Sequence, residues 1–434
     1  MHEQLTIQGV PVADIVAVHG SPTYVYDGEA LTQQYQRLRD ALPAAVDVFY
    51  SLKANPNVAL TALLVRAGAG AEVSSLTELR TALRAGVDPA DVIFLGPGKS
   101  DDELRECCEL GVRAVVVESL PELARLDAVA GAAGRRQPVL LRVNPDFQVK
   151  GSGLTMGGKA RQFGVDVDQA VAAGRAVGAH EWARVVGVHV YMGTRILAAE
   201  AVVENTERIL ALAERVAEAC GIDLEVVDVG GGLGVPYFPK EDPLDLDVVG
   251  RGVRDAVERF RARHPRVRMI LESGRYLVAE CGTYVLGVRY VKESFGERFA
   301  VADGGTNHHM AAVGIGSVLK RNFPMGLVGR ASTAPTAPWH LTGPLCTPAD
   351  ELGKNVDLPS DLRPGDLVGV FRSGAYGPTA SPVHFLSHGY PAEVLVHDGE
   401  VHLVRHRDTP EDMLRQQVLP TILDPVTTDE GALL

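Results

Sequence analysis

The sequence lacks several features that mark particular classes of protein. Its 434 residues include 42 basic and 55 acidic side chains but no Lys/Arg-rich run, so nucleic acid is not an expected partner. No apolar stretch approaches the ~18 residues of a membrane span, and the N-terminus shows neither the basic nor the long apolar segment of a secretory leader. The five cysteines show no C-x-x-C spacing, which suits a reducing compartment. We therefore expect a cytoplasmic protein without membrane or nucleic-acid partners.

The first two thirds of the chain alternate short apolar runs with segments of helical period. Each apolar run is continuous, as in parallel strands that are buried on both faces. Eight strand–helix units within about 250 residues are typical of a (β/α)8 barrel, a TIM barrel, although a doubly wound open sheet is the alternative. The expected strands lie at residues 46–54, 70–75, 92–96, 114–119, 138–144, 185–192, 224–230 and 268–274.

The pattern changes at about residue 276, where apolar runs take on the period of two that is typical of half-buried strands. Asp398-Gly399 lies between two such runs and predicts a β-hairpin. The proline-rich residues 329–339 show no period and are expected to form a surface loop. These features predict a C-terminal domain that is mainly β.

The chain is longer than one hydrophobic core usually spans, so two domains are expected. We predict a barrel over residues 31–275 and a β domain over residues 276–434. The strand-like residues 23–27, "TYVYD", belong to an N-terminal segment, residues 1–30, that is expected to pack with the β domain.

Chemically active side chains recur where the predicted strands end. In barrels of this kind the catalytic groups lie at the C-terminal ends of the strands. A lysine, an imidazole, a glycine triplet and a carboxylate that meet at one barrel mouth predict an active site. The strand-end residues are Lys53, Ser74, Arg142, Asn144, His189, Gly230, Gly231, Gly232 and Glu272.

The glycine triplet after the seventh strand indicates a phosphate site. Successive glycines let backbone N–H groups approach an anion closely. The loops after strands seven and eight are the usual phosphate site of this fold, and Arg275 follows strand eight. A tight packing turn is the alternative, because glycine motifs often match by chance.

A phosphate site that faces a strand-end lysine indicates a phosphorylated aldehyde bound as a Schiff base, which is pyridoxal phosphate. Lys53 ends the run "VFYSLK", and Asn55-Pro56 would turn the chain so that the ammonium group points into the barrel mouth. We expect the pKa of Lys53 to be lowered toward neutral, as catalytic lysines require.

Six motifs in order resemble one family. They are "YSLKANPN", "GVHVYMGT", "VDVGGGLG", "ESGRYLVAECG", "GPLCTPADEL" and "RSGAYG". They are similar to the motif series of the fold-type III pyridoxal-phosphate-dependent decarboxylases, which include diaminopimelate and ornithine decarboxylases. The resemblance runs from about residue 20 to residue 415 and implies an alanine-racemase-like barrel with a C-terminal β domain.

The resemblance implies a role for each residue. Lys53 would hold the cofactor, His189 would stack on its ring, Glu272 would pair with its pyridine nitrogen, and Arg142 would lie near its phenolate. Cys346 would enter from the partner subunit of a homodimer and protonate Cα after carbon dioxide leaves. The catalytic set is Lys53, Cys346, His189 and Glu272; the cofactor-binding set is Lys53, Ser74, Arg142, His189, Gly231, Gly232, Glu272, Gly274, Arg275 and Tyr376; the substrate set is Thr347, Asp350 and Tyr376; and no metal is expected.

Simpler interpretations stay open for several of these residues. His189 is alternatively an ordinary core histidine, Cys346 an inert buried thiol and Tyr376 a packed aromatic. The adjacent His308 and His309 suggest a metal site, but no third ligand stands near them in the sequence.

The substrate end of the site departs from the family pattern. Diaminopimelate decarboxylases typically show Cys-Glu-Ser where this chain has Cys346-Thr347-Pro348. They also carry an Arg-Pro-x-Leu-Tyr segment whose arginine binds the distal carboxylate, and "ADGGTNHHMAAVGIG" lacks it. The stretches "GGTNHHMAAVGIG" and "HFLSHGYPAEVLV" look closer to a subgroup that includes decarboxylases of glutamyl units tethered to an acyl carrier protein.

An α-amino acid with an uncharged or tethered distal end is therefore the expected substrate. An acyl carrier protein is the expected partner, and the basic residues Lys320 and Arg321 are a candidate docking patch. The alternatives are a diaminopimelate decarboxylase, an amino-acid racemase, against which Glu272 argues, and a regulator without catalytic activity.

Overall fold

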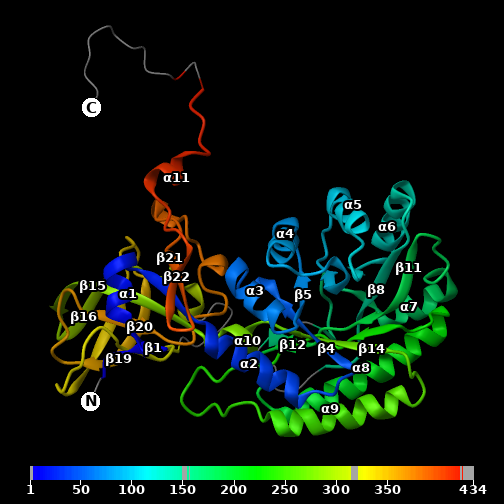
Figure 1. The fold of residues 1–434 in the computed structure, drawn as a ribbon, viewed down its shortest axis with the longest axis horizontal. Helices are drawn as coiled ribbons and strands as arrows, with labels where there is room; N and C mark the ends of the chain where they lie inside the picture. Colours follow the sequence, from blue (N-terminus) through cyan, green and yellow to red (C-terminus); the bar gives the residue numbers. More distant parts are fainter. Residues whose placement is uncertain (1–2, 149–153, 156, 314–320, 421–422, 424–434) are drawn as a thin grey trace.

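The computed structural model describes residues 3–148, 154–155, 157–313, 321–420 and 423. Figure 1 shows two bodies beside each other, a barrel surrounded by helices and a smaller body made mainly of strands. The candidate docking residue Lys320 lies outside the described residues.

Eight parallel strands close into the barrel. Each strand pairs with the next in the order β4-β5-β6-β7-β8-β11-β13-β14, and β14 pairs with β4 to complete the ring. A short strand β10 (Val165–Asp166) is added at β8. All eight predicted strands are confirmed, and the open sheet is excluded. Their bounds are β4 Val46–Ser51, β5 Gly70–Val73, β6 Val92–Phe94, β7 Ala114–Val117, β8 Gln137–Asn144, β11 Ala183–His189, β13 Val226–Asp228 and β14 Arg268–Ser273.

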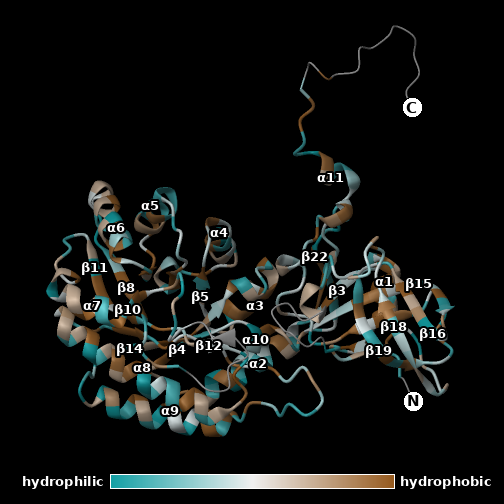
Figure 2. Ribbon diagram, turned by 180° about the vertical axis from the view of Figure 1, so that it is seen from behind, coloured by the Kyte–Doolittle hydropathy of each residue, from teal (hydrophilic) through white to brown (hydrophobic). Residues whose placement is uncertain are grey.

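Helices cover the outside of the barrel (Figure 1). Most of them begin at a side chain that accepts the first free backbone N–H groups, such as Ser75 before α4 or Ser100 before α5. Figure 2 shows hydrophobic and hydrophilic residues interleaved along α8 and α9, as amphipathic helices require. The helices are α2 Gly28–Ala41, α3 Val58–Arg66, α4 Leu76–Arg84, α5 Asp101–Leu110, α6 Leu120–Ala133, α7 Val167–Ala173, α8 Ala199–Cys220, α9 Leu246–Arg261 and α10 Arg275–Val278.

Apolar side chains fill the barrel interior below its mouth. One compact cluster draws its members from the barrel strands and the residues directly after them. A filled interior leaves the carboxyl ends of the strands as the place where a ligand can enter. The cluster consists of Phe49, Ile93, Leu95, Ala114, Val116, Leu140, Val186, Val226 and Ile270.

The second body is built on a sheet in the order β19-β18-β16-β15-β3-β21-β22, with β20 on β15 and β17 on β20. Strand β3 (Thr23–Asp27) pairs with both β15 and β21, so the N-terminal "TYVYD" is part of this sheet. Asp398 and Gly399 both have positive φ in the turn between β21 and β22, which confirms the predicted hairpin. The other strands are β15 Gly282–Ser294, β16 Glu297–Ala302, β17 Met325–Leu327, β18 Thr336–Thr342, β19 Glu351–Pro359, β20 Leu367–Val370, β21 Ala392–His397 and β22 Glu400–Arg405.

Two details of this body extend the sequence prediction. The predicted loop over residues 329–339 is wrong at its end, because β18 begins at Thr336. Thr336–Trp339 pair with β19 alone, and Pro338 is tolerated in such an edge position. At the N-terminus, helix α1 (Val12–His19) and the short pair β1 (Thr6–Ile7) and β2 (Val10–Pro11) pack apolar residues on the sheet.

Among the described residues, no helix is long and apolar enough to span a membrane.

His308 and His309 lie buried in the second body, where their rings form hydrogen bonds with other groups of the protein. His308 Nδ1 lies 3.0 Å from the Tyr284 hydroxyl and Nε2 lies 2.9 Å from the Gly389 carbonyl oxygen, while His309 Nε2 lies 3.2 Å from Ser373 Oγ. Burial lowers the pKa of His308 to about 4 and that of His309 to about 3. Both imidazoles are therefore neutral in the folded protein at neutral pH.

These two histidines predict a loss of stability in mild acid. Between pH ~6.5 and ~4 these two histidines bind protons in the unfolded chain but stay neutral in the folded protein. The free energy of unfolding therefore falls as the pH falls. We expect the urea midpoint to drop between pH 7 and pH 5, and to drop less in His309→Gln, which can still bond Ser373. Equal pH slopes for the two proteins would contradict this expectation.

Candidate active site

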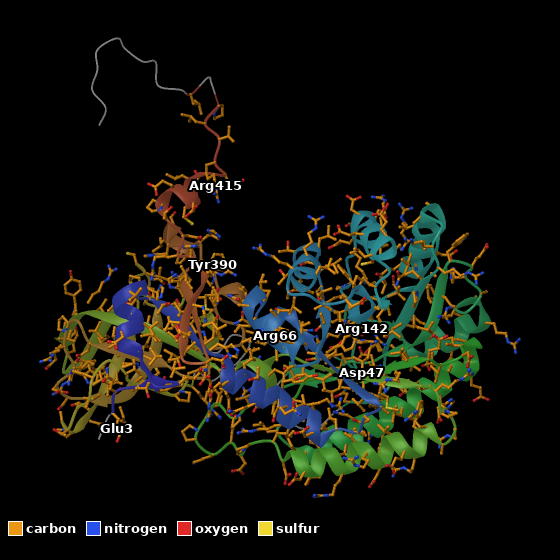
Figure 3. The ribbon with its side chains drawn as sticks, viewed as in Figure 1. Glu3, Asp47, Arg66, Arg142, Tyr390 and Arg415 are labelled. Atoms are coloured by element: carbon orange, nitrogen blue, oxygen red, sulfur yellow. The ribbon has the colours of Figure 1, made fainter. Side chains whose placement is uncertain are left out.

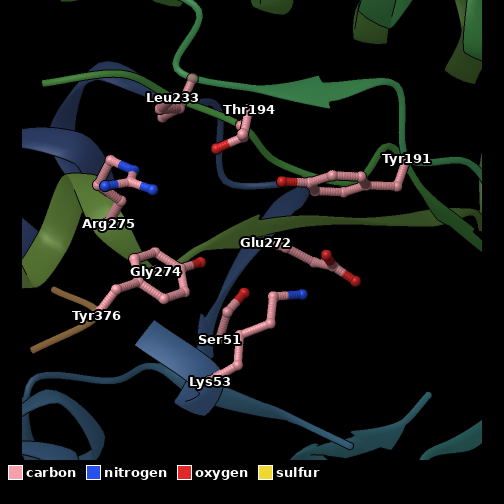
Figure 4. A pocket seen from close by; sticks show the side chains of 10 residues that line it. Ser51, Lys53, Tyr191, Thr194, Leu233, Glu272, Gly274, Arg275 and Tyr376 are labelled. Atoms are coloured by element: carbon pink, nitrogen blue, oxygen red, sulfur yellow. The ribbon is translucent and has the colours of Figure 1, made fainter. Parts of the chain in front are cut away.

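A cavity of about 440 Å³ opens at the carboxyl ends of the barrel strands. A smaller pocket adjoins it and adds Ser51, Gly232, Leu233 and Gly274 to the walls (Figure 4). The two pockets bring together most of the residues that the sequence singles out. The cavity is lined by Lys53, Ser74, Leu95, Gly96, Pro97, Arg142, Phe163, His189, Tyr191, Thr194, Glu272, Arg275 and Tyr376.

Lys53 lies on a single 3-10 turn, Leu52–Ala54, directly after β4. The backbone around this turn is fixed from both bodies of the protein. The Tyr50 hydroxyl donates to the Asn55 carbonyl oxygen at 2.6 Å, and the Asn55 side chain donates to the Gly374 carbonyl oxygen at 2.9 Å. The Tyr376 N–H donates to the Ala54 carbonyl oxygen at 2.7 Å. Lys53 and Tyr376 are therefore held in one arrangement.

The ammonium group of Lys53 is paired with a carboxylate that the sequence analysis missed. Lys53 Nζ lies 3.1 Å from Glu72 Oε2, and the Glu72 side chain is fully buried on β5. Burial by itself would lower the pKa of Lys53, but the carboxylates of Glu72 and Glu272 raise it, and the net shift is upward. The expectation of a lysine pKa near neutral is wrong for the protein without its cofactor. Ser74 Oγ also bonds Glu72, at 3.3 Å.

His189, Asp228 and Glu272 form a buried cluster at the base of the cavity. His189 Nε2 lies 3.1 Å from Glu272 Oε1. One ring nitrogen of His189 and one carboxylate oxygen each of Asp228 and Glu272 all lie within 4.8 Å of one another. Burial would raise the pKa of Glu272, but His189, Lys53 and Arg142 outweigh burial and lower it. Burial and the charge of Glu272 raise the pKa of Asp228 well above its usual range. Glu272 is therefore ionised at neutral pH, whereas the surroundings of Asp228 favour its neutral form.

Arg142 projects from the end of β8 and meets a second carboxylate that the sequence did not reveal. Arg142 Nη1 lies 2.8 Å from Glu118 Oε1, and both side chains are buried. The Phe163 ring covers the guanidinium, with its centroid 4.7 Å from Arg142 Cζ. Asn144, the neighbouring strand-end residue, does not line the cavity but bonds the backbone of Gly158 and Lys159.

The opposite end of the site carries Arg275, Tyr376 and the glycines. Arg275 Nη1 donates to the Tyr237 hydroxyl at 3.1 Å, and its guanidinium lies over the Tyr376 ring at 4.6 Å. Figure 4 shows Arg275 and Tyr376 side by side, away from the Lys53 ammonium group, which points toward Glu272.

The glycines stand where the backbone is crowded. A Cβ on Gly231 would overlap the Glu272 carbonyl oxygen, and a Cβ on Gly232 would overlap the Gly193 carbonyl oxygen. Tight packing therefore explains part of the triplet. Neither glycine N–H donates in any hydrogen bond found between described residues. Gly232 lines the smaller pocket of the site, whereas Gly231 lines a separate pocket against α8, so Gly232 is the better placed of the two to meet an anion.

Of the residues predicted for catalysis and substrate binding, three do not line this cavity within the same chain. Cys346 is exposed, and neither it nor Thr347 lines the cavity. Asp350, which the sequence assigns to the substrate, is buried instead. Its Oδ1 accepts from Thr306 N at 2.7 Å and Oγ1 at 2.9 Å, and its Oδ2 accepts from Leu345 N at 2.8 Å. Its carboxylate therefore orders the loop that carries Cys346.

The cavity also contains residues that the sequence analysis did not select. Tyr191 and Thr194 lie within the quoted motif "GVHVYMGT", so that motif contained a usable signal. The sequence signal for Glu72 was weaker, because it was only that of an acidic residue inside a buried strand. Leu95 belongs to the apolar run 92–96, which predicted a strand but not a place in the cavity. Pro97 and Phe163 stand on loops without a recognisable pattern, and the three residues form the apolar wall.

The unpartnered atoms of the site fit pyridoxal phosphate. His189 Nδ1, Glu272 Oε2 and Arg275 Nε are buried and have no hydrogen-bond partner among the described residues. A protonated ring nitrogen suits the free oxygen of Glu272, and a phosphate suits Arg275 and the unpartnered N–H of Gly232. Lys53 supplies the amine that an aldehyde requires.

Comparisons with known proteins agree with this fit. Residues 29–279 match the family model described as pyridoxal-dependent decarboxylase, pyridoxal binding domain. The chain is 39% identical over 405 residues to an L-glutamyl-[BtrI acyl-carrier protein] decarboxylase of Niallia circulans, covering 92% of this chain and 94% of that protein. It is 35% identical to a diaminopimelate decarboxylase of Pseudomonas aeruginosa, covering 94% and 96%.

Solved structures give the same result. The crystal structure of a diaminopimelate decarboxylase from Helicobacter pylori complexed with L-lysine superposes with a TM-score of 0.84 at 28% identity, covering 93% of this chain and 98% of that one. The fold, the strand-end residues and the relatives lead to one conclusion: this chain belongs to the pyridoxal-dependent decarboxylases, enzymes that use pyridoxal phosphate as their cofactor.

Proposed function

We propose that this enzyme removes the α-carboxyl group of an amino acid whose distal end is uncharged or tethered. A glutamyl thioester on an acyl carrier protein fits best, and its product would be the 4-aminobutyryl thioester. The observation that carries the proposal is the cavity wall. After the cofactor is placed, the described lining offers no free charged side chain to a distal group.

Each charged residue of that lining has a partner or an assigned task. Arg142 pairs with Glu118, and Glu272 with His189. Lys53 and Arg275 are the groups that we assign to the cofactor. The rest of the lining has no acidic or basic side chain, and Leu95, Pro97 and Phe163 form its apolar part. A buried distal charge without a partner costs several kcal/mol, so this wall favours a neutral acyl chain.

The loop that holds Cys346 supports the same substrate class. Thr347 is neutral, and Asp350 has both carboxylate oxygens engaged by Thr306 and Leu345. Neither residue is free to pair with a distal ammonium group. The glutamyl carrier-protein decarboxylase of Niallia circulans matches 92% of the chain at 39% identity and supports this choice.

We assign the cofactor-binding residues as the sequence predicts them. Glu272 would pair with the ring nitrogen, His189 would stack on the ring, and Arg142 would face the phenolate oxygen. Pyridoxal phosphate supplies an electron sink for the bond to the departing carboxyl group. The phosphate would be held by Gly231, Gly232, Gly274, Arg275 and Tyr376, and Ser74 would orient Glu72 beside Lys53.

We also propose an oligomeric state, domain boundaries and a cellular location for the enzyme. The exposed position of Cys346, outside its own cavity, supports a homodimer in which each chain completes the site of its partner. We place the domain boundaries at residues 30–31 and 275–276. All five cysteines are free, which supports a reducing cytoplasm.

Diaminopimelate is the second candidate substrate. The diaminopimelate decarboxylase of Pseudomonas aeruginosa is 35% identical over 94% of the chain, and the Helicobacter pylori structure has the same fold. The neutral wall and the engaged Asp350 argue against a substrate that carries two charges at its distal end.

A comparison of substrates tests the proposal. We expect kcat/KM for carrier-bound glutamate to exceed that for free diaminopimelate by about 10-fold or more, because the site leaves distal charges unpaired. The glutamyl thioester of pantetheine is the matched control, since it has the same acyl chain without the carrier protein. A clear preference for diaminopimelate by a fully loaded enzyme would refute the assignment.

A further inference from the structure

A buried chain of charges lies behind the wall of the cavity. Arg142, seen within the barrel in Figure 3, lines the cavity and bonds Glu118 at 2.8 Å, and the two side chains are 6% and 2% exposed. The other carboxylate oxygen of Glu118 accepts the Gly164 N–H at 3.0 Å. One carboxylate thus binds both a cavity guanidinium and a loop that is 46 residues further along the chain.

The loop that Glu118 holds carries the aromatic part of the wall. Phe163 directly precedes Gly164, and its ring covers the Arg142 guanidinium. Gly164 has a φ of +75°, and a Cβ there would lie 3.1 Å from the Arg142 carbonyl oxygen. The conformation of this loop therefore depends on its close approach to β8.

The chain of charges continues to the other loop of the wall. The Glu118 N–H donates to Glu122 Oε2 at 2.7 Å, and Glu122 Oε1 pairs with Lys99 Nζ at 2.6 Å. Lys99 donates in turn to the Gly96 carbonyl oxygen at 2.5 Å, and Gly96 lines the cavity between Leu95 and Pro97. The two apolar wall segments and Arg142 are therefore joined below the surface.

Stability alone does not account for this arrangement. Buried ion pairs are often no more stabilising than apolar residues of the same volume, because desolvation offsets the attraction between the charges. What such pairs supply is a fixed geometry for each donor and acceptor. Here that geometry belongs to groups that face a ligand.

We propose that Glu118 is a positioning residue. Its carboxylate holds the Arg142 guanidinium at the cofactor site and, through the Gly164 N–H, holds the loop that places Phe163 against that guanidinium. The guanidinium and the apolar wall then keep one common arrangement. The inference rests on the cofactor placement proposed above, and a readout that needs no cofactor separates the two.

Glu118→Gln tests the proposal on the full-length enzyme. The amide preserves the shape but cannot accept from both Arg142 and Gly164. We expect the diluted holoenzyme to lose its cofactor about 10-fold faster, which is the usual effect of one lost charge-assisted hydrogen bond. We also expect trypsin to cleave about 10-fold faster at Lys159 and Arg161, which are exposed, both with the cofactor and after its removal.

Two comparisons separate positioning from a general loss of stability. Asp47→Asn breaks an ion pair with Arg268 at the amino end of β4, whereas the cavity lies at the carboxyl ends of the strands, and it should change neither rate. The double variant Glu118→Gln, Arg142→Gln should lose cofactor no faster than Arg142→Gln alone, because Glu118 acts through Arg142.

The proposal fails if Glu118→Gln changes neither the rate of cofactor loss nor the rate of trypsin cleavage. It also fails if the double variant loses its cofactor faster than Arg142→Gln by the full factor that Glu118→Gln causes alone. Faster cleavage without faster cofactor loss also overturns it, since the carboxylate would then order only the loop. If Glu118→Gln does not fold, Gly164→Ala provides the test. The added Cβ would press on the Arg142 backbone, both rates should rise, and unchanged rates would overturn the proposal.

Discussion

Glu272→Gln is expected to lower kcat by about 10²- to 10³-fold, the usual effect of removing a preorganised charge from an active site. Glu272 is ionised in the structure because His189, Lys53 and Arg142 outweigh the effect of burial on its pKa. Its free Oε2 can hold a proton on the ring nitrogen of the cofactor only while the carboxylate is charged. A neutral amide of the same shape removes that charge and leaves the packing intact.

The measurement must separate chemistry from cofactor binding. Cofactor occupancy is read from visible absorbance, and kcat is then compared at full occupancy. Asp366→Asn is the matched control. Asp366, like Glu272, is a buried carboxylate in an ion pair, but its partner is Arg330 and it lies in the other body of the protein. We expect kcat of this control to stay within about twofold of wild type. A normal kcat in Glu272→Gln would show that another group controls the ring nitrogen.

The barrel could be predicted from the sequence because its signals are local. A continuous apolar run marks a strand that is buried on both faces, and the residue at its end faces the barrel mouth. Lys53, His189 and Glu272 were found in this way, and the structure brings all three into one cavity. The hairpin at Asp398-Gly399 was equally local, since two positive φ values identify the turn.

The partners of these residues could not be predicted, because they depend on contacts between distant segments. The pKa of Lys53 is raised by Glu72, which stands on the neighbouring strand, whereas the sequence shows only that the lysine is buried. Glu118 acquires its role only when the chain returns at Gly164. Asp350 appears free near Cys346 in the sequence, but its carboxylate accepts a hydrogen bond from Thr306, which is far away along the chain. The sequence therefore reveals the reactive groups better than what restrains them.

Lys53→Ala and Cys346→Ala are each expected to be almost inactive, and mixing them is expected to restore activity. Lys53 supplies the amine that binds the cofactor, and a cysteine that donates a proton to Cα contributes about 10²- to 10⁴-fold. Cys346 is exposed and lies outside its own cavity, so we expect it to act on the site of the partner chain. A mixed dimer then contains one site with both wild-type residues.

The size of the recovery follows from the symmetry of a dimer. Random exchange makes about half of the dimers mixed, and one of the two sites in each is complete, so activity should reach about a quarter of the wild-type value. Native mass spectrometry reports the exchange. The matched control mixes Lys53→Ala with the double variant Lys53→Ala, Cys346→Ala, which forms mixed dimers without a complete site and should stay inactive. If exchange is complete and the first mixture also stays inactive, Cys346 does not act across the dimer, and the proton must come from a group within the cavity of the same chain.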